Sequence, residues 1–410
     1  MGNIFYRIKQ SLIMAGFSGV LFSFRPVVYA IFERRRDYTE YSSVDNSALV
    51  FIAYAVLSFI VAFREIQKNH QKFYSRLFFH SNLVIFEIYS ALAFLSIFWT
   101  VNVPLTGYRA FECVSQLLII SVVVAKLQLE HGTRQMLAWI LSWYVCFDII
   151  CHIIKHIPAW DTMLQLSQMT ATVFFFLAIF NAPNKFIKYL IAVFSIFSSS
   201  TTSYIGMAIG TFSMFWGNKR LKATATLLCV VLICAIASFG TYRVLKNTVF
   251  IKRSEIGLEY MNGRDMLWIN AFTAAAEKPW TGYGFFAGEP YILYRHYTGA
   301  INAHSSFCSA LLGLGYPGFV LISLYILSYI PILLGKNSFG QYRAALMGCY
   351  AVAVCHCIAN PGIGSRVFGS WTSVMTLFVM INAIAISGII TDAENSKNLY
   401  QTSPMPSQLI

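Results

Sequence analysis

Long runs without a charged residue alternate with short basic segments along most of the chain. The runs cover residues 46–63, 88–108, 162–184, 189–218, 223–242, 296–335, 344–365 and 367–391. A hydrocarbon core about 30 Å thick needs roughly 20 apolar residues in a helix. Each run therefore predicts a membrane-spanning helix. Residues 189–218 are too long for one span, and the polar stretch 198–203 divides them, so we expect two short spans there.

Three further apolar segments each contain a single charge. They are residues 11–32 with Arg25, 113–129 with Lys126 and 135–154 with Asp148. Counting them as spans gives an all-α polytopic membrane protein of about twelve transmembrane helices, with one large periplasmic loop that contains short helices. Intramembrane charges such as Arg25, Glu87 and Asp148 indicate either function or mutual pairing.

Loop charges set the expected orientation, because cytoplasmic loops carry an excess of Lys and Arg. With the N-terminus inside, most basic loop residues are cytoplasmic, including Arg64, Lys68, Lys72, Arg76, Lys126, Arg134, Lys185, Lys188, Lys219, Arg220, Lys222, Lys336 and Arg343. The loop from Arg34 to Arg36 falls outside. Either the first segment does not fully span, or the acidic neighbours exempt these arginines.

This topology divides the chain into four parts. They are an N-terminal transmembrane bundle (1–240), a large periplasmic loop (241–303), C-terminal transmembrane helices (304–391) and a disordered cytoplasmic tail (392–410). A loop as long as 241–303 is unusual and is commonly functional. We therefore look for chemistry there first.

Composition supports the membrane assignment. Apolar residues make up 57% of the 410 residues and charged residues 11%, and the mean hydropathy is +0.61, whereas soluble chains carry about 25% charge. Thirty Lys and Arg against 17 Asp and Glu give a net charge of +13. Because these basic residues are scattered over short loops, they favour membrane lipids with anionic headgroups and not nucleic acid.

Two segments inside the large loop carry candidate chemistry. Asn262 can cap a helix that starts near Arg264 and ends before Pro279, with an apolar face of Leu267, Trp268, Ala271, Phe272 and Ala275. Arg264 lies one turn before Trp268, next to free backbone N–H groups, which favours a site for phosphate oxygens. The alternative is a surface arginine paired with Asp265. Gly282 and Gly284 then predict a tight turn with positive φ, not a dinucleotide fingerprint.

An aromatic and basic cluster follows at Tyr291, Tyr294, Arg295, His296 and Tyr297. Such residues stack on sugar faces or populate the membrane interface. His304 then lies in the first turn of a long apolar helix that Gly315 and Pro317 are expected to kink. The positive end of a helix disfavours an imidazolium ion, so His304 can accept a proton; a simple interfacial hydrogen bond is the alternative.

No segment has metal-ligand spacing. His152, Lys155 and His156 share a face without a carboxylate or thiol set, and the spacing of Cys355, His356 and Cys357 suits buried packing better than zinc. We predict no metal and no cofactor.

The motifs together resemble a known family. Gly263-Arg264 followed by Trp268, Pro279 with Gly282 and Gly284, Ala303-His304 with Phe307, and Gly315 with Gly318 are similar to the bacterial O-antigen ligase and polymerase family, which includes exopolysaccharide polymerases. Upstream, Ser96, Trp99, Pro104, Arg109 and Ala110 resemble an outer-loop segment of that family. The resemblance extends from about residue 78 to residue 390.

The resemblance implies a glycosyltransferase of the bacterial inner membrane with a periplasmic active site. It would move an oligosaccharide from undecaprenyl diphosphate to a glycan or lipid acceptor without a metal. Carried onto this chain, Arg264 and His304 are catalytic, and Arg264, Arg295 and Arg109 bind the diphosphate. Trp268, Tyr283 and Tyr294 are candidate glycan contacts, and a chain-length regulator is a candidate partner.

Two positions depart from the family pattern. Ser305 stands where the family often has Asn, and Thr201 stands where it commonly has a basic residue. These departures favour an O-antigen, capsule or exopolysaccharide polymerase over an O-antigen ligase that uses lipid A core. A transporter or flippase of lipid-linked oligosaccharide is the alternative from another class, although it would lead us to expect two similar halves.

Overall fold

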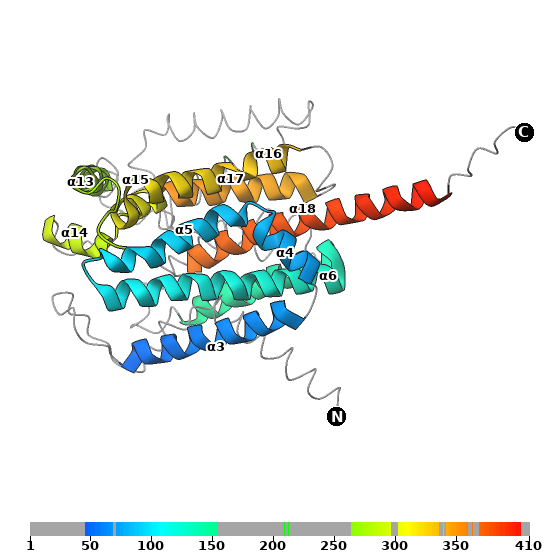
Figure 1. Cartoon of the computed structure of the whole chain (residues 1–410), viewed down its shortest axis with the longest axis horizontal. Helices are drawn as coiled ribbons and strands as arrows, with labels where there is room; N and C mark the ends of the chain where they lie inside the picture. The colour runs from blue at the N-terminus through cyan, green and yellow to red at the C-terminus, as the bar shows by residue number, and fades with distance from the viewer. Residues whose placement is uncertain are drawn as a thin grey trace, which may run out of the picture.

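The computed structural model describes residues 46–68, 71–154, 209, 212, 264–296, 302–335, 339, 342–359, 363 and 369–402. The elements in this part of the chain are all helical. They are α3 (Asn46–Lys68), α4 (Gln71–Phe79), α5 (Leu83–Leu95), η1 (Ser96–Phe98), α6 (Val103–Ile154), α13 (Arg264–Glu277), α14 (Gly288–His296), α15 (Ser306–Leu327), α16 (Tyr329–Leu334), α17 (Arg343–Ala359) and α18 (Gly369–Thr402). Figure 1 shows them as a bundle with α13 and α14 at one end.

Three of the described helical segments are long and apolar enough to cross a membrane. They are Leu49–Lys68, Val103–Ile140 and Ser306–Leu334, and a fourth results if α4 and α5, which are bent by 68°, form one span. These segments indicate a membrane protein, as predicted. Apart from Ile209 and Phe212, the predicted spans within 11–32, 162–184, 189–218 and 223–242 lie outside the described residues, so the total of about twelve stays a prediction.

The uncharged run 88–108 is not one span, which corrects the prediction. Within it α5 ends at Leu95, a short η1 turn follows, and α6 begins at Val103. The side chain of Asn102 accepts a hydrogen bond from Leu105 N–H at 3.1 Å, and Thr100 Oγ1 accepts one from Asn102 N–H at 3.2 Å. Asn102 thus binds an N–H group in the first turn of the new helix, and Thr100 binds the N–H of Asn102 just before it.

Two other boundaries bear on the predictions. The apolar segments 113–129 and 135–154 were predicted as separate spans, and α6 is broken between them at Gly132, where φ is 74°. The tail was predicted to be disordered from residue 392 onward, whereas α18 continues to Thr402. No glycine or proline interrupts residues 389–402, and Pro404 comes only after the helix has ended.

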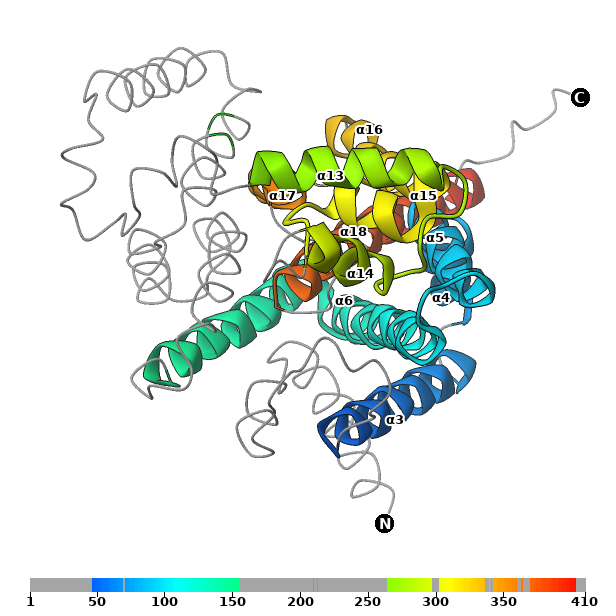
Figure 2. The same ribbon diagram turned by 90° about the vertical axis from the view of Figure 1, so that its left-hand side faces the viewer.

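An aromatic core joins α5, α15, α16 and α18. The rings of Tyr329 and Phe378 stack at 4.4 Å, and Tyr325 contacts both Phe86 at 5.2 Å and Phe378 at 5.4 Å. Each such pair contributes about 0.5–1.5 kcal/mol beyond the area that it buries. Helices α5, α15, α16 and α18 are thereby fixed to one another. Figure 2 shows α13 lying across this assembly, beside α14, and α13 packs on α15.

Candidate active site

Helix α13 begins at Arg264 and ends at Glu277, two residues before Pro279, as predicted. Its buried side is made of small residues and one leucine: Leu267, Ala271, Ala274 and Ala275. Phe272 was predicted to share that side but is 51% exposed, because the buried positions recur every three or four residues and Phe272 falls off that line. The side chain of Arg264 lies outside the described residues.

The glycine turn, which we define as residues 279–288, contains the predicted positive φ angles. They are 61° at Gly282 and 101° at Gly284. Its backbone bonds directly to α15: Tyr283 N–H donates to Leu312 O and Gly284 N–H to Gly313 O, both at 2.9 Å. The turn is therefore held by main-chain hydrogen bonds to a helix about thirty residues further along the chain.

Helix α15 is broken at Gly315, where φ is 67°, which confirms the expected kink. Because of this break, the carbonyl groups of Leu312 and Gly313 accept hydrogen bonds from the glycine turn. In the other direction, Tyr316 N–H donates to Pro279 O at 2.7 Å. A Cβ on Gly315 would lie 2.4 Å from Pro279 O, and one on Gly282 would lie 2.6 Å from the Gly313 carbonyl carbon. The two glycine motifs therefore form one contact in which neither backbone tolerates a side chain.

The upstream segment 96–106 joins the same contact. Trp99 Nε1 donates to Thr281 O at 2.7 Å, and Val101 N–H donates to Tyr283 O at 3.1 Å. Phe285 N–H donates to Ser96 Oγ, and Thr106 Oγ1 donates to Phe285 O, each at 3.0 Å. Motifs from three distant parts of the sequence thus meet around the glycine turn.

His304 is positioned through its neighbour Ala303. Trp268 Nε1 donates to Ala303 O at 2.9 Å, and Ala303 N–H donates to a carboxylate oxygen of Glu289 at 2.5 Å. His304 itself has a positive φ of 48°, and its N–H donates to Asn302 Oδ1 at 3.0 Å. It lies two residues before α15, which begins at Ser306, and not in the first turn as predicted. Such a conformation persists only where surrounding bonds determine it.

Glu289 is a candidate site residue that sequence reasoning missed. Its side chain is 2% exposed, and besides Ala303 N–H it accepts a hydrogen bond from Ser309 Oγ at 2.7 Å. One carboxylate therefore connects α14, the segment before His304 and the first turn of α15. The sequence shows Glu289 only as one acid in the charge balance of the loop. Its burial depends on partners that are distant along the chain.

Two predicted site residues have structural partners. Arg109 is buried, pairs with Glu112 at 2.8 Å and lies 4.3 Å over the ring of Phe286. Tyr283 is also buried, and its hydroxyl bonds to Ala274 O at 3.2 Å and Glu277 at 2.8 Å. These contacts favour a positioning role for both residues over contact with a substrate.

Other predicted residues are only partly described. Tyr294 and Arg295 belong to the last turn of α14 and precede His304 in the sequence. Their side chains lie outside the described residues. Those of His152, Asp148 and Arg25 also lie outside, as do Lys155 and His156. Within the described residues His356 and Cys357 are buried in α17, in keeping with packing. No group of three His, Cys, Asp or Glu side chains suited to a metal occurs in that same part.

Part of the chain that contains this site is similar to a known family. No curated protein matches the chain. A family model described as O-Antigen ligase matches residues 186–323, a segment that contains α13, α14, the glycine turn, His304 and the break in α15, but not Arg109. The match confirms, over residues 186–323, the resemblance of this chain to the O-antigen ligase and polymerase family.

Proposed function

We propose that this protein is a metal-independent glycosyltransferase of the bacterial inner membrane that polymerises undecaprenyl-diphosphate-linked repeat units at the periplasmic face. The observation that carries the proposal is the pair of hydrogen bonds at Ala303. Through them Trp268, one turn after Arg264, and Glu289 both bind the residue before His304. These bonds support the proposal that the start of α13 and His304 belong to one site.

In this proposal Arg264 and Arg295 hold the diphosphate. A guanidinium group makes two parallel hydrogen bonds to phosphate oxygens, and the N-terminus of α13 adds free N–H groups and a positive dipole end. Breaking the bond between the anomeric carbon and the phosphate oxygen leaves negative charge on the departing diphosphate. Fixed cations stabilise that charge in the transition state.

His304 is the proposed base. An acceptor hydroxyl oxygen attacks the anomeric carbon as the diphosphate leaves, and the hydroxyl proton passes to the imidazole. The backbone bonds at Ala303 and His304 reduce the freedom of the ring, and such orientation lowers the barrier of a reaction between two bound sugars. Arg109 and Tyr283 act by holding the glycine turn.

The O-antigen ligase reaction is the second candidate, because the matching family model carries that description. It uses the same chemistry at the donor and differs in the acceptor, which would be lipid A core in place of a growing glycan. The described residues provide no contact that favours a flippase, and nothing in them bears on a chain-length regulator, so the proposal includes neither.

A deletion strain distinguishes these functions. Accumulation of single lipid-linked repeat units at the periplasmic face supports the polymerase, and finished polymer that never joins lipid A core supports the ligase. Repeat units that remain on the cytoplasmic side would overturn both. The purified protein in liposomes, supplied with lipid-linked repeat units alone, should form polymer. Transfer of the repeat unit to added lipid A core, with no polymer formed in its absence, would assign the ligase reaction.

A further inference from the structure

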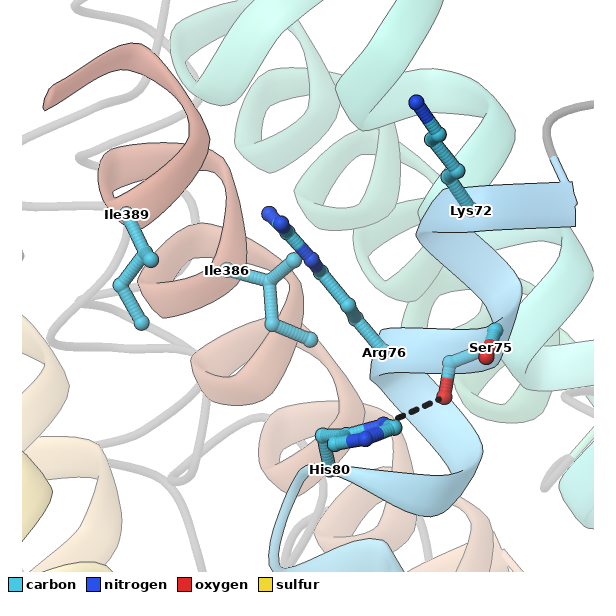
Figure 3. Close-up of a pocket in the computed structure, with 6 residues that line it drawn as sticks. All are labelled: Lys72, Ser75, Arg76, His80, Ile386 and Ile389. Atoms are coloured by element: carbon cyan, nitrogen blue, oxygen red, sulfur yellow. Dashed lines mark hydrogen bonds between the residues drawn. The ribbon is translucent and has the colours of Figure 1, made fainter. Parts of the chain in front are cut away.

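A basic pocket lies at the other end of the bundle. It has a volume of about 710 Å³ and is lined by Lys72, Ser75, Arg76, His80, Ile386 and Ile389, from α4, the residue after it, and α18. Figure 1 shows α4 toward the end opposite α13 and α14. In Figure 3 the side chain of Arg76 extends from α4 toward Ile386 of α18. The pocket is thus separate from the candidate active site.

The basic side chains of this pocket come from one short stretch of the chain. Lys72 and Arg76 are four residues apart, which places them along one side of α4, and His80 follows the end of that helix. Within the described part of the chain neither Lys72 nor Arg76 has an acidic partner, whereas Lys126 on α6 is shared by Glu65 at 3.6 Å and Glu130 at 3.2 Å. Like charges four residues apart repel each other, and a bound anion would relieve that repulsion.

The surroundings indicate an anion with an apolar tail. Ile389 on the pocket wall is 59% exposed, and Phe79 at the end of α4 is 69% exposed. Helix α4 is bent away from α5 by 68° and buries Phe73 and Leu77 while Lys72 and Arg76 stay exposed. A short helix with one apolar and one basic side is typical of the membrane interface. A soluble anion would make no use of the exposed isoleucine.

We propose that this pocket binds the phosphate group of an anionic phospholipid, with an acyl chain along Ile386 and Ile389. The lipid belongs to the cytoplasmic leaflet, because the loop charges place Lys72 and Arg76 inside. Such a lipid holds α4 against α18 and fixes the bend before α5. This proposal does not depend on the transferase reaction.

The test compares lipid retention by the full-length protein in detergent, measured by native mass spectrometry with added phosphatidylglycerol. Replacing two cations, Lys72→Gln with Arg76→Gln, should weaken phosphatidylglycerol binding about 30-fold, since each basic residue near an anionic surface contributes about 1 kcal/mol. The matched control is Arg64→Gln with Lys68→Gln on exposed positions of α3, which removes the same charge and should leave binding unchanged.

Four results would overturn the proposal. They are wild-type binding by the Lys72→Gln, Arg76→Gln variant, equal loss in the α3 control, equal retention of zwitterionic phosphatidylcholine, and displacement of the lipid by millimolar inorganic phosphate, which would assign a site for the free anion. The exchange Lys72→Arg with Arg76→Lys keeps both charges and should restore binding. If the double Gln variant does not fold, the single Lys72→Gln change should still weaken binding about fivefold.

Discussion

Different interactions determine the structure at the two ends of this bundle. At the α13–α15 end, the glycine turn and His304 are held by main-chain hydrogen bonds and by a buried carboxylate. At the α4–α18 end, the pocket depends on exposed cationic side chains without acidic partners among the described residues. We therefore expect a single added methyl group to destabilise the first end, and the removal of charge to weaken anion binding at the second.

The largest effect is expected from the two residues that the proposed reaction uses directly. His304→Ala and Arg264→Ala should each lower polymer formation on the order of 100-fold or more, by analogy with removal of one oxyanion-hole donor. The amount of inserted protein should stay normal, because neither change adds a side chain to the α15 contact. Polymer length and yield in a complemented deletion strain measure this. Full activity in either variant would remove that residue from the site.

The next largest effect is expected on stability, from a substitution in the contact between the glycine turn and α15. Gly315→Ala places a Cβ 2.4 Å from Pro279 O at a residue with a φ of 67°, and the strained backbone alone costs about 1–3 kcal/mol. We expect a lower thermal unfolding midpoint and less accumulated protein. Gly107→Ala in α6 is the control, because its Cβ would meet only Ile97 at 3.6 Å and alanine favours a helix. Equal midpoints in both variants would contradict the tight contact described above.

Glu289 gives an effect of intermediate size. Glu289→Ala leaves the Ala303 N–H without its buried acceptor, at a cost of about 1–3 kcal/mol, whereas the Ser309 hydroxyl keeps its bond to Ser305 O. Because the same bonds orient His304, polymer formation should fall more than the amount of folded protein does. Glu289→Gln keeps one acceptor oxygen and should recover part of the activity. A loss that tracks protein amount alone would assign Glu289 a purely structural role.

At the α13–α15 end, the sequence predicted the backbone conformations better than the side-chain contacts that hold them. Gly282 and Gly284 predicted positive φ angles because glycine adopts them without strain, and Gly315 with Pro317 predicted a kink in α15. The start of α13 at Arg264 followed from local helix signals. Glu289 could not be recognised, because its partners Ala303 and Ser309 lie 14 and 20 residues further along the chain. Burial of a carboxylate is decided by such distant donors.

The helix predictions failed for a related reason. Counting uncharged residues found α3 and the helices from Ser306 onward, because Lys336, Arg343 and Arg366 separate the apolar runs there. It joined the end of α5 to the start of α6, because Asn102 carries no charge although its side chain binds Leu105 N–H in the first turn of α6. Charge determines what can lie in a membrane, whereas hydrogen-bonding side chains determine where a helix begins.

The smallest effect tests whether α13 positions His304 through a single bond. Trp268→Phe keeps an aromatic ring in the half-buried position but removes the indole N–H that donates to Ala303 O. A neutral hydrogen bond contributes about 0.5–1.5 kcal/mol, so polymer formation should fall about two- to tenfold while the unfolding midpoint changes little. Phe272→Leu on the exposed side of α13 is the control and should leave activity unchanged. If Trp268→Phe has wild-type activity, the bond to Glu289 alone positions His304, and Glu289→Ala should then account for the whole positioning effect.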